Sequence, residues 1–296
     1  MSNKNNIELP DDEFRVIGRG PKQPEKKKGL PWLWVAALCI LAVVAAILFL
    51  VRKHAGSEPE TGIFESRTEA VIPQARDQQL LGAPVDSTAG PYVEIVDTTI
   101  NDVVLTIYLP NNATPVLCVG NPSAELRAKG VLAFQAADIR ADNRKILGAF
   151  VLKGEPLAWG LSKKGFVAII NGKVTVGVSE NSPLFEEATE KGGYFFRQYP
   201  LVDKGILCES ELKGKTMRKA ICDRAGQVFC VVSETDESMH DFAQALIDLG
   251  VNNAVYLVGS HYSFGWCRHD LGSEPSLFAE DEHKPMYKNE SYIIWK

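Results

Sequence analysis

The longest apolar run in the chain lies near its start and carries no charged side chain. It extends from Leu30 to Val51, a length of 22 residues. At about 1.5 Å of rise per residue, a helix of this length crosses a hydrocarbon core of about 30 Å. A helix suits that environment because it satisfies its own backbone hydrogen bonds where no water is present. The run therefore predicts one transmembrane helix at 30–51.

Basic residues flank this run unequally. Within about 16 residues of the run, six precede it and three follow it: Arg15, Arg19, Lys22, Lys26, Lys27 and Lys28 before, and Arg52, Lys53 and Arg67 after. The excess favours a cytoplasmic N-terminus and a periplasmic or otherwise extracytoplasmic C-terminal part. A cleaved signal peptide is the competing interpretation. It fits poorly, because 29 residues precede the run and no small-x-small cleavage site accompanies it.

Composition divides the rest of the chain into three parts. Residues 1–29 are polar and mixed in charge, which predicts a short cytoplasmic tail. Residues 52–91 are rich in Pro, Gly, Ser and Glu and predict a linker. Residues 92–296 form the predicted folded domain, which would be the ectodomain of a single-pass membrane protein.

Short β-branched runs dominate that domain and predict strands. They cover 103–109, 116–119, 131–134, 166–170, 174–178 and 254–258. Asn171-Gly172 lies between two of them and predicts a tight hairpin turn, since both positions tolerate positive φ angles. A second hairpin is predicted over 219–233, turning at 223–226.

Two segments have helical signals. Ser182 and Pro183 begin one that ends before Gly192. The other runs over 236–249, with apolar residues on one face, and ends at Gly250. Many strands with few helices predict an α+β fold, in which a mixed sheet is covered by helices and preceded by the transmembrane helix.

Charge and cysteine content exclude several classes of protein. The net charge of −5 argues against a nucleic-acid partner, which would need clustered Lys and Arg. Five of the six cysteines fall in the predicted domain, an odd number that leaves at least one thiol free: Cys118, Cys208, Cys222, Cys230 and Cys267. Their spacing fits neither a zinc site nor a disulfide scaffold, so no metal and no cofactor are expected.

The standard hydrolase motifs are mostly absent. The segment 261–265 lacks the first glycine of a nucleophile elbow and is not followed by a helical pattern. His261, Cys267, His269 and Asp270 could bind a metal, but their spacing matches no tetrahedral zinc site, which favours ordinary loop residues.

The segment GGYFFRQYP at 192–200 has unusual local chemistry. Its aromatic residues surround Arg197 and Gln198, and an arginine binds phosphate in a bidentate manner while sugars stack on aromatic rings. A phosphosugar site is one interpretation. The other is a core strand in which Arg197 pairs with a carboxylate.

Five short motifs follow one another through the domain. They are FQAADI at 134–139, GAFV at 148–151 with Gly154, YPLVDKG at 199–205, RKAIC at 218–222 with Gly226, and LGVNNAVYLVGSHYS at 249–263. In this order they resemble the motifs of the phosphodiester glycosidase family, over about residues 92–270. The resemblance implies a mixed α+β fold and hydrolysis of the bond between a sugar and a phosphodiester-linked group.

The resemblance also implies roles for individual residues. Arg218 and Arg197 would hold the phosphate, with Gln198 beside them. Gln135 would bind sugar hydroxyls in place of the family's Asn, and Ser263 would stand for one of its serines. The departures are substantial, because Val258 occupies the position of the family's Asp. Two of the family's glycines are Ala136 and Ala137.

Two hypotheses accommodate these departures. In the first, the site is rebuilt, and Asp138 and His261 move the protons in an envelope enzyme that acts on a glycan or a sugar phosphodiester. In the second, the domain keeps the fold without turnover and binds a glycan or a protein partner. The first requires Gln135, Asp138, Arg218 and His261 to lie together.

Overall fold

The computed structural model describes residues 81–296 except Glu211 and residues 279–286, and these all belong to the compact unit Thr68–Lys296. The predicted tail, the predicted transmembrane helix at 30–51 and most of the predicted linker lie outside the described residues. Of the helices that are described, none has the length and apolarity needed to cross a membrane.

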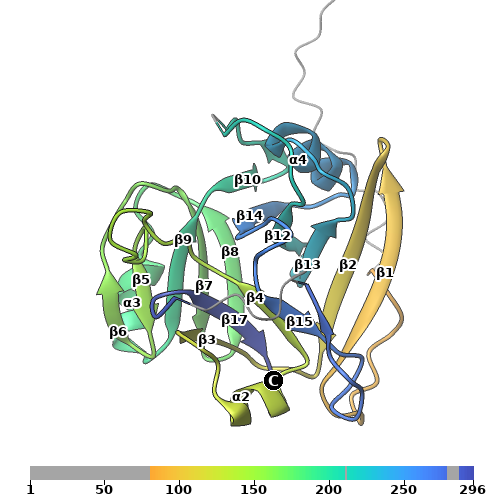
Figure 1. The fold of residues 1–296 in the computed structure, drawn as a ribbon, viewed down its shortest axis with the longest axis horizontal. Helices are drawn as coiled ribbons and strands as arrows, with labels where there is room; N and C mark the ends of the chain where they lie inside the picture. The colour runs from red at the N-terminus through yellow and green to blue at the C-terminus, as the bar shows by residue number, and fades with distance from the viewer. Residues whose placement is uncertain (1–80, 211, 279–286) are drawn as a thin grey trace, which may run out of the picture. The chain divides into compact units, whose positions relative to one another are not determined.

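A seven-stranded antiparallel sheet forms one side of the domain (Figure 1). Its order is β1-β2-β13-β12-β14-β10-β11. The strands are β1 Tyr92–Ile100, β2 Val103–Asn111, β13 Gln227–Ser233, β12 Lys219–Arg224, β14 Asn253–Leu257, β10 Pro200–Asp203 and β11 Ile206–Leu207.

Two five-stranded antiparallel sheets complete the architecture. One has the order β16-β15-β4-β17-β3, with β16 Ser276–Leu277, β15 Gly265–Cys267, β4 Leu132–Gln135, β17 Ser291–Trp295 and β3 Pro115–Val119. The other has the order β6-β5-β9-β7-β8, with β6 Glu155–Ala158, β5 Phe150–Leu152, β9 Tyr194–Gln198, β7 Gly165–Ile170 and β8 Lys173–Val178.

The predicted α+β class is therefore wrong, because the described residues form three antiparallel sheets with little helical cover. The described helices are short: α2 Ala124–Lys129, α3 Leu184–Glu190 and α4 Met239–Asp248. Only α4 among them packs on the seven-stranded sheet, through Met239, Phe242 and Leu246. The sheets bury most of their apolar faces against one another, which the short apolar runs alone did not reveal.

The local turn and helix predictions are confirmed. Strands β7 and β8 pair around Asn171 and Gly172, whose φ angles are 52° and 77°. Strands β12 and β13 form the second hairpin. Helix α4 is capped by Ser238, whose side chain accepts a hydrogen bond from the main-chain N–H of Asp241, and Gly250 follows its end with a φ of 90°. These signals are local, so the sequence alone could reveal them.

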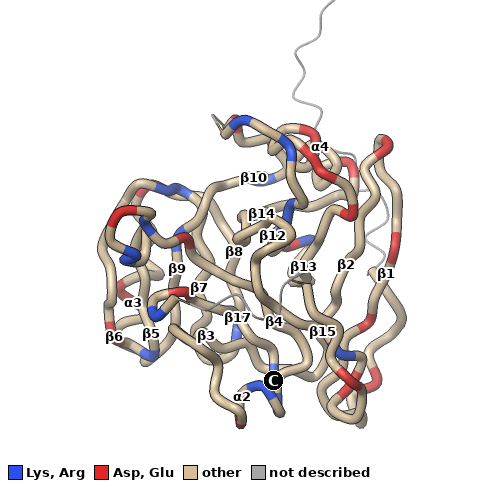
Figure 2. Tube along the Cα trace, in the orientation of Figure 1, with Lys and Arg blue, Asp and Glu red and all other residues tan. Residues whose placement is uncertain are grey.

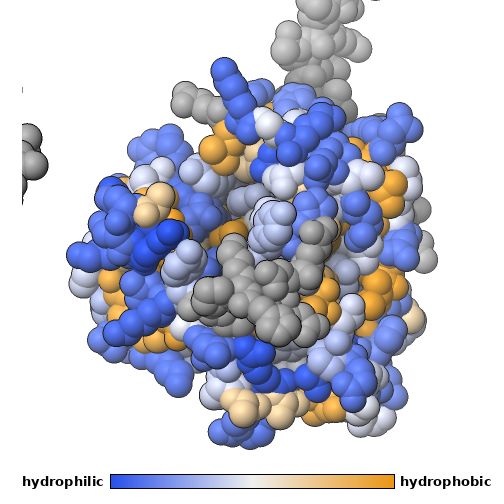
Figure 3. Space-filling view, in the orientation of Figure 1, coloured by the Kyte–Doolittle hydropathy of each residue, from blue (hydrophilic) through white to orange (hydrophobic). Residues whose placement is uncertain are grey.

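The main core lies where the three sheets face one another. Buried side chains from all three meet there, including Phe134 from β4, Phe196 from β9 and Val255 from β14. The outer surface in the space-filling view is mostly hydrophilic, with smaller hydrophobic groups between the charged side chains (Figure 3). The ends of strands from different sheets therefore lie close together at this core.

Candidate functional site

The candidate site lies where β4, β12 and β14 come together. The main-chain N–H of Val258, just after β14, donates to the carbonyl oxygen of Gln135 at the end of β4, at 3.1 Å. Two residues further on, the N–H of Ser260 donates to the carbonyl of Met217, just before β12, at 2.9 Å. The segment after β14 is thereby fixed to two other strands.

A buried lysine is the central group on one side of this junction. The Lys163 side chain is 1% exposed, and its Nζ forms an ion pair with Asp138, whose side chain is 27% exposed. The same Nζ donates to Oε1 of the fully buried Gln198 at 2.6 Å and lies 4.2 Å from the Tyr199 ring centroid. Burial lowers the pKa of Lys163, and the charge and hydrogen bond of Asp138 partly oppose that shift.

A buried arginine lies on the other side of the junction. Arg218 Nε donates to the carbonyl of Glu237 at 2.8 Å, and a terminal nitrogen donates to that of Gly214 at 2.7 Å. The hydroxyl of Tyr256 accepts the N–H of Gly259 at 3.2 Å. Burial raises the pKa of Tyr256, a hydrogen bond with Arg218 lowers it, and the charge of Asp138 raises it slightly. The Arg218 guanidinium carbon lies 5.9 Å from the centroid of the Tyr256 ring.

His261 belongs to the turn after β14. Its Nε2 lies 3.0 Å from Oδ1 of Asp236, with side chains 36% and 56% exposed. Asp236 precedes Glu237, whose carbonyl accepts a hydrogen bond from Arg218. One loop therefore contacts both His261 and Arg218. A carboxylate that contacts one ring nitrogen fixes the orientation of an imidazole, which is an arrangement suited to proton transfer.

The other predicted residues occupy less accessible positions. Arg197 is 2% exposed and donates to the main-chain carbonyls of Lys163, Ser179 and Glu180, each at 2.8 Å. It therefore lies in a core strand, although its partners are carbonyls rather than a carboxylate. Gln135 is buried in β4 opposite Tyr292.

Ser263 is buried next to a residue that was not predicted. Its Oγ accepts a hydrogen bond from Nζ of Lys219 at 2.6 Å and donates to the carbonyl of Ser260 at 3.1 Å.

Four residues of this region were not predicted as site residues: Lys163, Tyr199, Tyr256 and Lys219. Lys163 lies in the polar segment SKKG, which is indistinguishable by composition from an exposed loop. Tyr199 and Lys219 belong to motifs that carry the resemblance, and a search of those motifs for unexpected charged or aromatic residues could have found them. Lys219 stands where the resembled hairpin has Thr.

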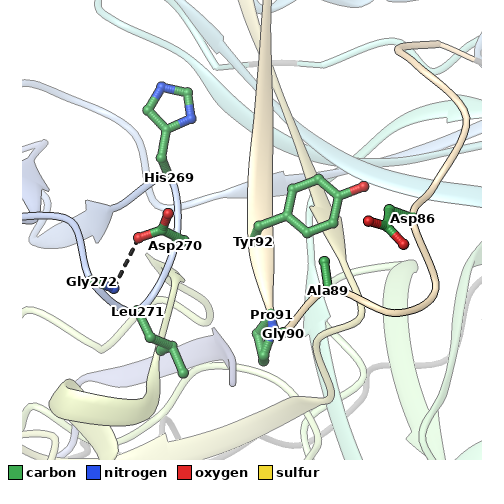
Figure 4. A pocket seen from close by; sticks show the side chains of 9 residues that line it. All are labelled: Asp86, Ala89, Gly90, Pro91, Tyr92, His269, Asp270, Leu271 and Gly272. Carbon is green, nitrogen blue, oxygen red and sulfur yellow. Dashed lines mark hydrogen bonds between the residues drawn. The ribbon is translucent and has the colours of Figure 1, made fainter.

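Two hollows in the described part of the chain are lined by other residues. The larger, about 690 Å³, is at the start of β1, where Tyr92 lies between Asp86 on one side and His269 and Asp270 on the other (Figure 4). Both carboxylates accept local hydrogen bonds, from Thr88 and from Gly272.

The smaller hollow, about 380 Å³, lies between the β1–β2 turn and α4. Acidic residues gather in this region and along β1 (Figure 2).

Comparisons with known proteins give likenesses of structure but none of sequence. No family profile and no curated protein sequence matches this chain. The catalytic domain of zebrafish N-acetylglucosamine-1-phosphodiester alpha-N-acetylglucosaminidase, auto-inhibited by its pro-peptide, is similar at 13% identity and a TM-score of 0.49, over 72% of this chain and 85% of that one.

A hypothetical protein from Synechocystis is similar at 13% identity and a TM-score of 0.50, over 72% of this chain and 64% of that one. This chain thus spans under two thirds of the Synechocystis protein. The second likeness shows a shared fold. The first has the lower score and carries no argument about the activity of this chain.

Proposed function

We propose that this domain binds a sugar phosphodiester between the Asp138–Lys163 pair and Arg218 and hydrolyses its glycosidic bond. The observation that carries the proposal is the charge balance at the junction. Lys163 and Arg218 are buried there, and Asp138 is the carboxylate paired with Lys163. Buried positive charge in excess favours an anionic ligand, because its field is weakly screened.

Each group has a chemical role in this proposal. Asp138 is partly exposed, and its carboxylate, oriented by Lys163, accepts a proton from the attacking water. His261, oriented by Asp236, donates a proton to the glycosidic oxygen. Arg218 attracts the phosphate through its positive charge, and the face of Tyr199 stacks on the sugar ring. The five motifs that resemble the phosphodiester glycosidases support the same class of substrate.

A second candidate function is glycan or protein binding without turnover. Three features favour it. Val258 replaces the acid of the resembled motif, and valine can neither transfer a proton nor bind a metal. Ala136 and Ala137, where that motif has glycines, are buried. The Arg218 guanidinium already donates to two main-chain carbonyls and binds phosphate directly only if one of those bonds is given up.

The proposed location is the outer face of a membrane. It depends on the apolar run 30–51 and its basic flanks. Resistance of the full-length protein to alkaline extraction from membranes tests the anchor. Labelling of an added surface cysteine by an impermeant reagent on intact cells tests the orientation, and no labelling before lysis contradicts it.

Hydrolysis and binding of a methyl glycosyl-1-phosphodiester separate the two functions. The full-length protein is compared with Asp138→Asn, with His261→Ala and with Asp142→Asn, a control that removes an exposed carboxylate paired with Arg140. Enzymatic function predicts a loss of about 100-fold or more for the first two variants and none for the control. Circular dichroism establishes that each variant is folded.

Each remaining outcome has a definite meaning. Binding by the wild-type protein without turnover, weakened by Asp138→Asn, supports the binding module. Neither binding nor turnover contradicts the proposed ligand class. Equal rates in all four proteins contradict the roles of Asp138 and His261.

A further inference from the structure

A second buried lysine lies near the candidate site but faces the core between the sheets. Lys219 begins β12 and is 1% exposed. Its Nζ donates to the Oγ of Ser263 at 2.6 Å and to the carbonyl of the same residue at 3.3 Å. Among the residues that the structure describes, no carboxylate forms an ion pair with Lys219.

Apolar residues flank Lys219 on the neighbouring strands. Its Cα partners are Val232 on β13 and Leu257 on β14. The centroid of the Phe278 ring lies 5.4 Å from Nζ, and His261 of the neighbouring turn contacts Asp236. Burial lowers the pKa of Lys219 to about 8. A substantial fraction of the amine is therefore neutral under mildly alkaline conditions.

Ser263 lies in a turn that reaches the surface of the domain. It is 4% exposed, and the residue before it, Tyr262, is 57% exposed. The turn that carries Ser263 is fixed by its own hydrogen bonds. The N–H of Ser263 donates to the carbonyl of Ser260 at 3.3 Å, and Ser260 has a φ of 72°, a left-handed conformation that costs free energy in a residue with a side chain.

We propose that Ser263 and Lys219 form a nucleophile and base pair that accepts a small acyl group, such as acetyl, from an ester. The inference does not rest on the proposed function, because it uses neither Asp138 nor Arg218. A hydroxyl becomes nucleophilic when an adjacent base removes its proton, and a desolvated lysine is able to supply that base. The low exposure of Ser263 restricts the substrate to a small acyl group.

The reaction balances without a cofactor. In the neutral form of the pair, Lys219 accepts the Oγ proton while Oγ attacks the carbonyl carbon of the ester. The C–O bond to the alcohol then breaks, and the Lys219 ammonium returns that proton to the leaving alkoxide. Water attacks the acyl-serine by the same route, which releases the acid and restores Ser263.

Treatment of the full-length protein with p-nitrophenyl acetate tests this pair. Peptide mass spectrometry locates the acetyl group, and the initial rate of acetylation at Ser263 is measured from pH 6 to 10. We expect acetyl-Ser263 to form at a rate that rises with pH, with its midpoint near pH 8, and then levels off as deprotonation of Lys219 is completed. Ser263→Ala should carry no acetyl group at this peptide.

Lys219→Met removes the base and keeps an unbranched side chain of similar length. It should slow acetylation of Ser263 by about 100-fold or more. Lys164→Met is the matched control, since Lys164 pairs with Glu180 on the surface, and its rate should equal that of the wild-type protein. Acetylation confined to exposed lysines, a rate at Ser263 that is independent of pH, or an unchanged rate in folded Lys219→Met would each overturn the proposal.

If Lys219→Met does not fold, the proposal is still tested by the wild-type protein. Its acetylation rate as a function of pH and the location of its acetyl group then give the answer. Failure here leaves the proposed sugar-phosphodiester function standing. A negative result in the phosphodiester assay likewise leaves the proposed Ser263–Lys219 pair standing, because the two assays use different residues and different reagents.

Discussion

Val258 donates its main-chain N–H to the carbonyl oxygen of Gln135, and this 3.1 Å bond joins strands of two different sheets. Its donor follows β14 of the seven-stranded sheet, and its acceptor ends β4 of a five-stranded sheet. Main-chain bonds do not depend on side-chain identity, so this junction persists although Val258 replaces the acid of the resembled motif. The fold can therefore keep the site in place while its chemistry changes.

Removal of the Asp138 carboxylate should destabilise the domain. Asp138→Asn leaves the buried Lys163 ammonium with Gln198 and the Tyr199 ring as its remaining neighbours, and an uncompensated buried charge costs about 3 kcal/mol of unfolding free energy. Addition of Lys163→Met should restore most of that loss, because the pair is then absent. Urea denaturation measures both variants. Asp138→Asn within 1 kcal/mol of the wild-type protein would contradict the inferred burial of the charge.

Gly259 should tolerate no side chain. A Cβ at this position would collide with the hydroxyl of Tyr256 and lie 2.7 Å from the carbonyl of Met217. We expect Gly259→Ala to lower the unfolding free energy by about 2 kcal/mol and to displace Tyr256 from Arg218. Gly90→Ala is the control, since no atom lies within 4 Å of its Cβ, and it should change stability by less than about 0.5 kcal/mol. Equal melting temperatures for the two variants would refute the collision.

Local features of the fold could be predicted from the sequence, whereas the assembly of the sheets could not. Asn171-Gly172 defines a hairpin by the φ angles that it permits, and Ser238 with Gly250 bounds α4 by capping. By contrast, β4 pairs with β17 at the far end of the chain. A short run such as LAFQ, the sequence of β4, does not identify the strand with which it pairs. It also does not identify the other sheets against which β4 packs. This is why the mixed sheet covered by helices was the wrong prediction.

The candidate site was partly predictable for a similar reason. Motif order led to Asp138, Arg218 and His261, which the proposed function combines in one site. Lys163 lies in a polar loop between β6 and β7, and its burial depends on the tertiary contact with Gln198, which is distant in sequence. Composition alone therefore cannot distinguish a buried lysine from an exposed one, because the distant residue that contacts it must also be known.

Arg197→Lys tests whether Arg197 is a structural residue or a phosphate ligand. Lysine cannot reproduce a guanidinium that donates to three carbonyls, so we expect a loss of about 3 kcal/mol in unfolding free energy. Phosphodiester affinity of the folded variant should stay within about twofold of the wild-type value. Arg140→Lys, at an exposed pair with Asp142, should alter neither quantity. Weakened binding with unchanged stability would instead assign Arg197 to the ligand.

Stability should depend on pH through the charge of Lys219. Burial lowers its pKa in the folded protein to about 8 from the ordinary value of 10.5. Between these values the unfolded chain binds more protons than the folded one, so the contribution of Lys219 to stability rises with pH across this window. Below about pH 8 the buried charge of Lys219 lowers the unfolding free energy by its full amount, about 3 kcal/mol from the size of the pKa shift.

Comparison with Lys219→Met isolates this contribution, because the tyrosines and cysteines titrate in both proteins. The variant should exceed the wild-type protein in unfolding free energy by the largest margin at pH 7, and the margin should shrink by about 3 kcal/mol by pH 10.5. Urea denaturation at pH 7, 8.5, 9.5 and 10.5 follows it. A margin that is constant with pH would mean that Lys219 keeps an ordinary pKa in the folded protein, and Ser263 would then have no neutral amine beside it near pH 8.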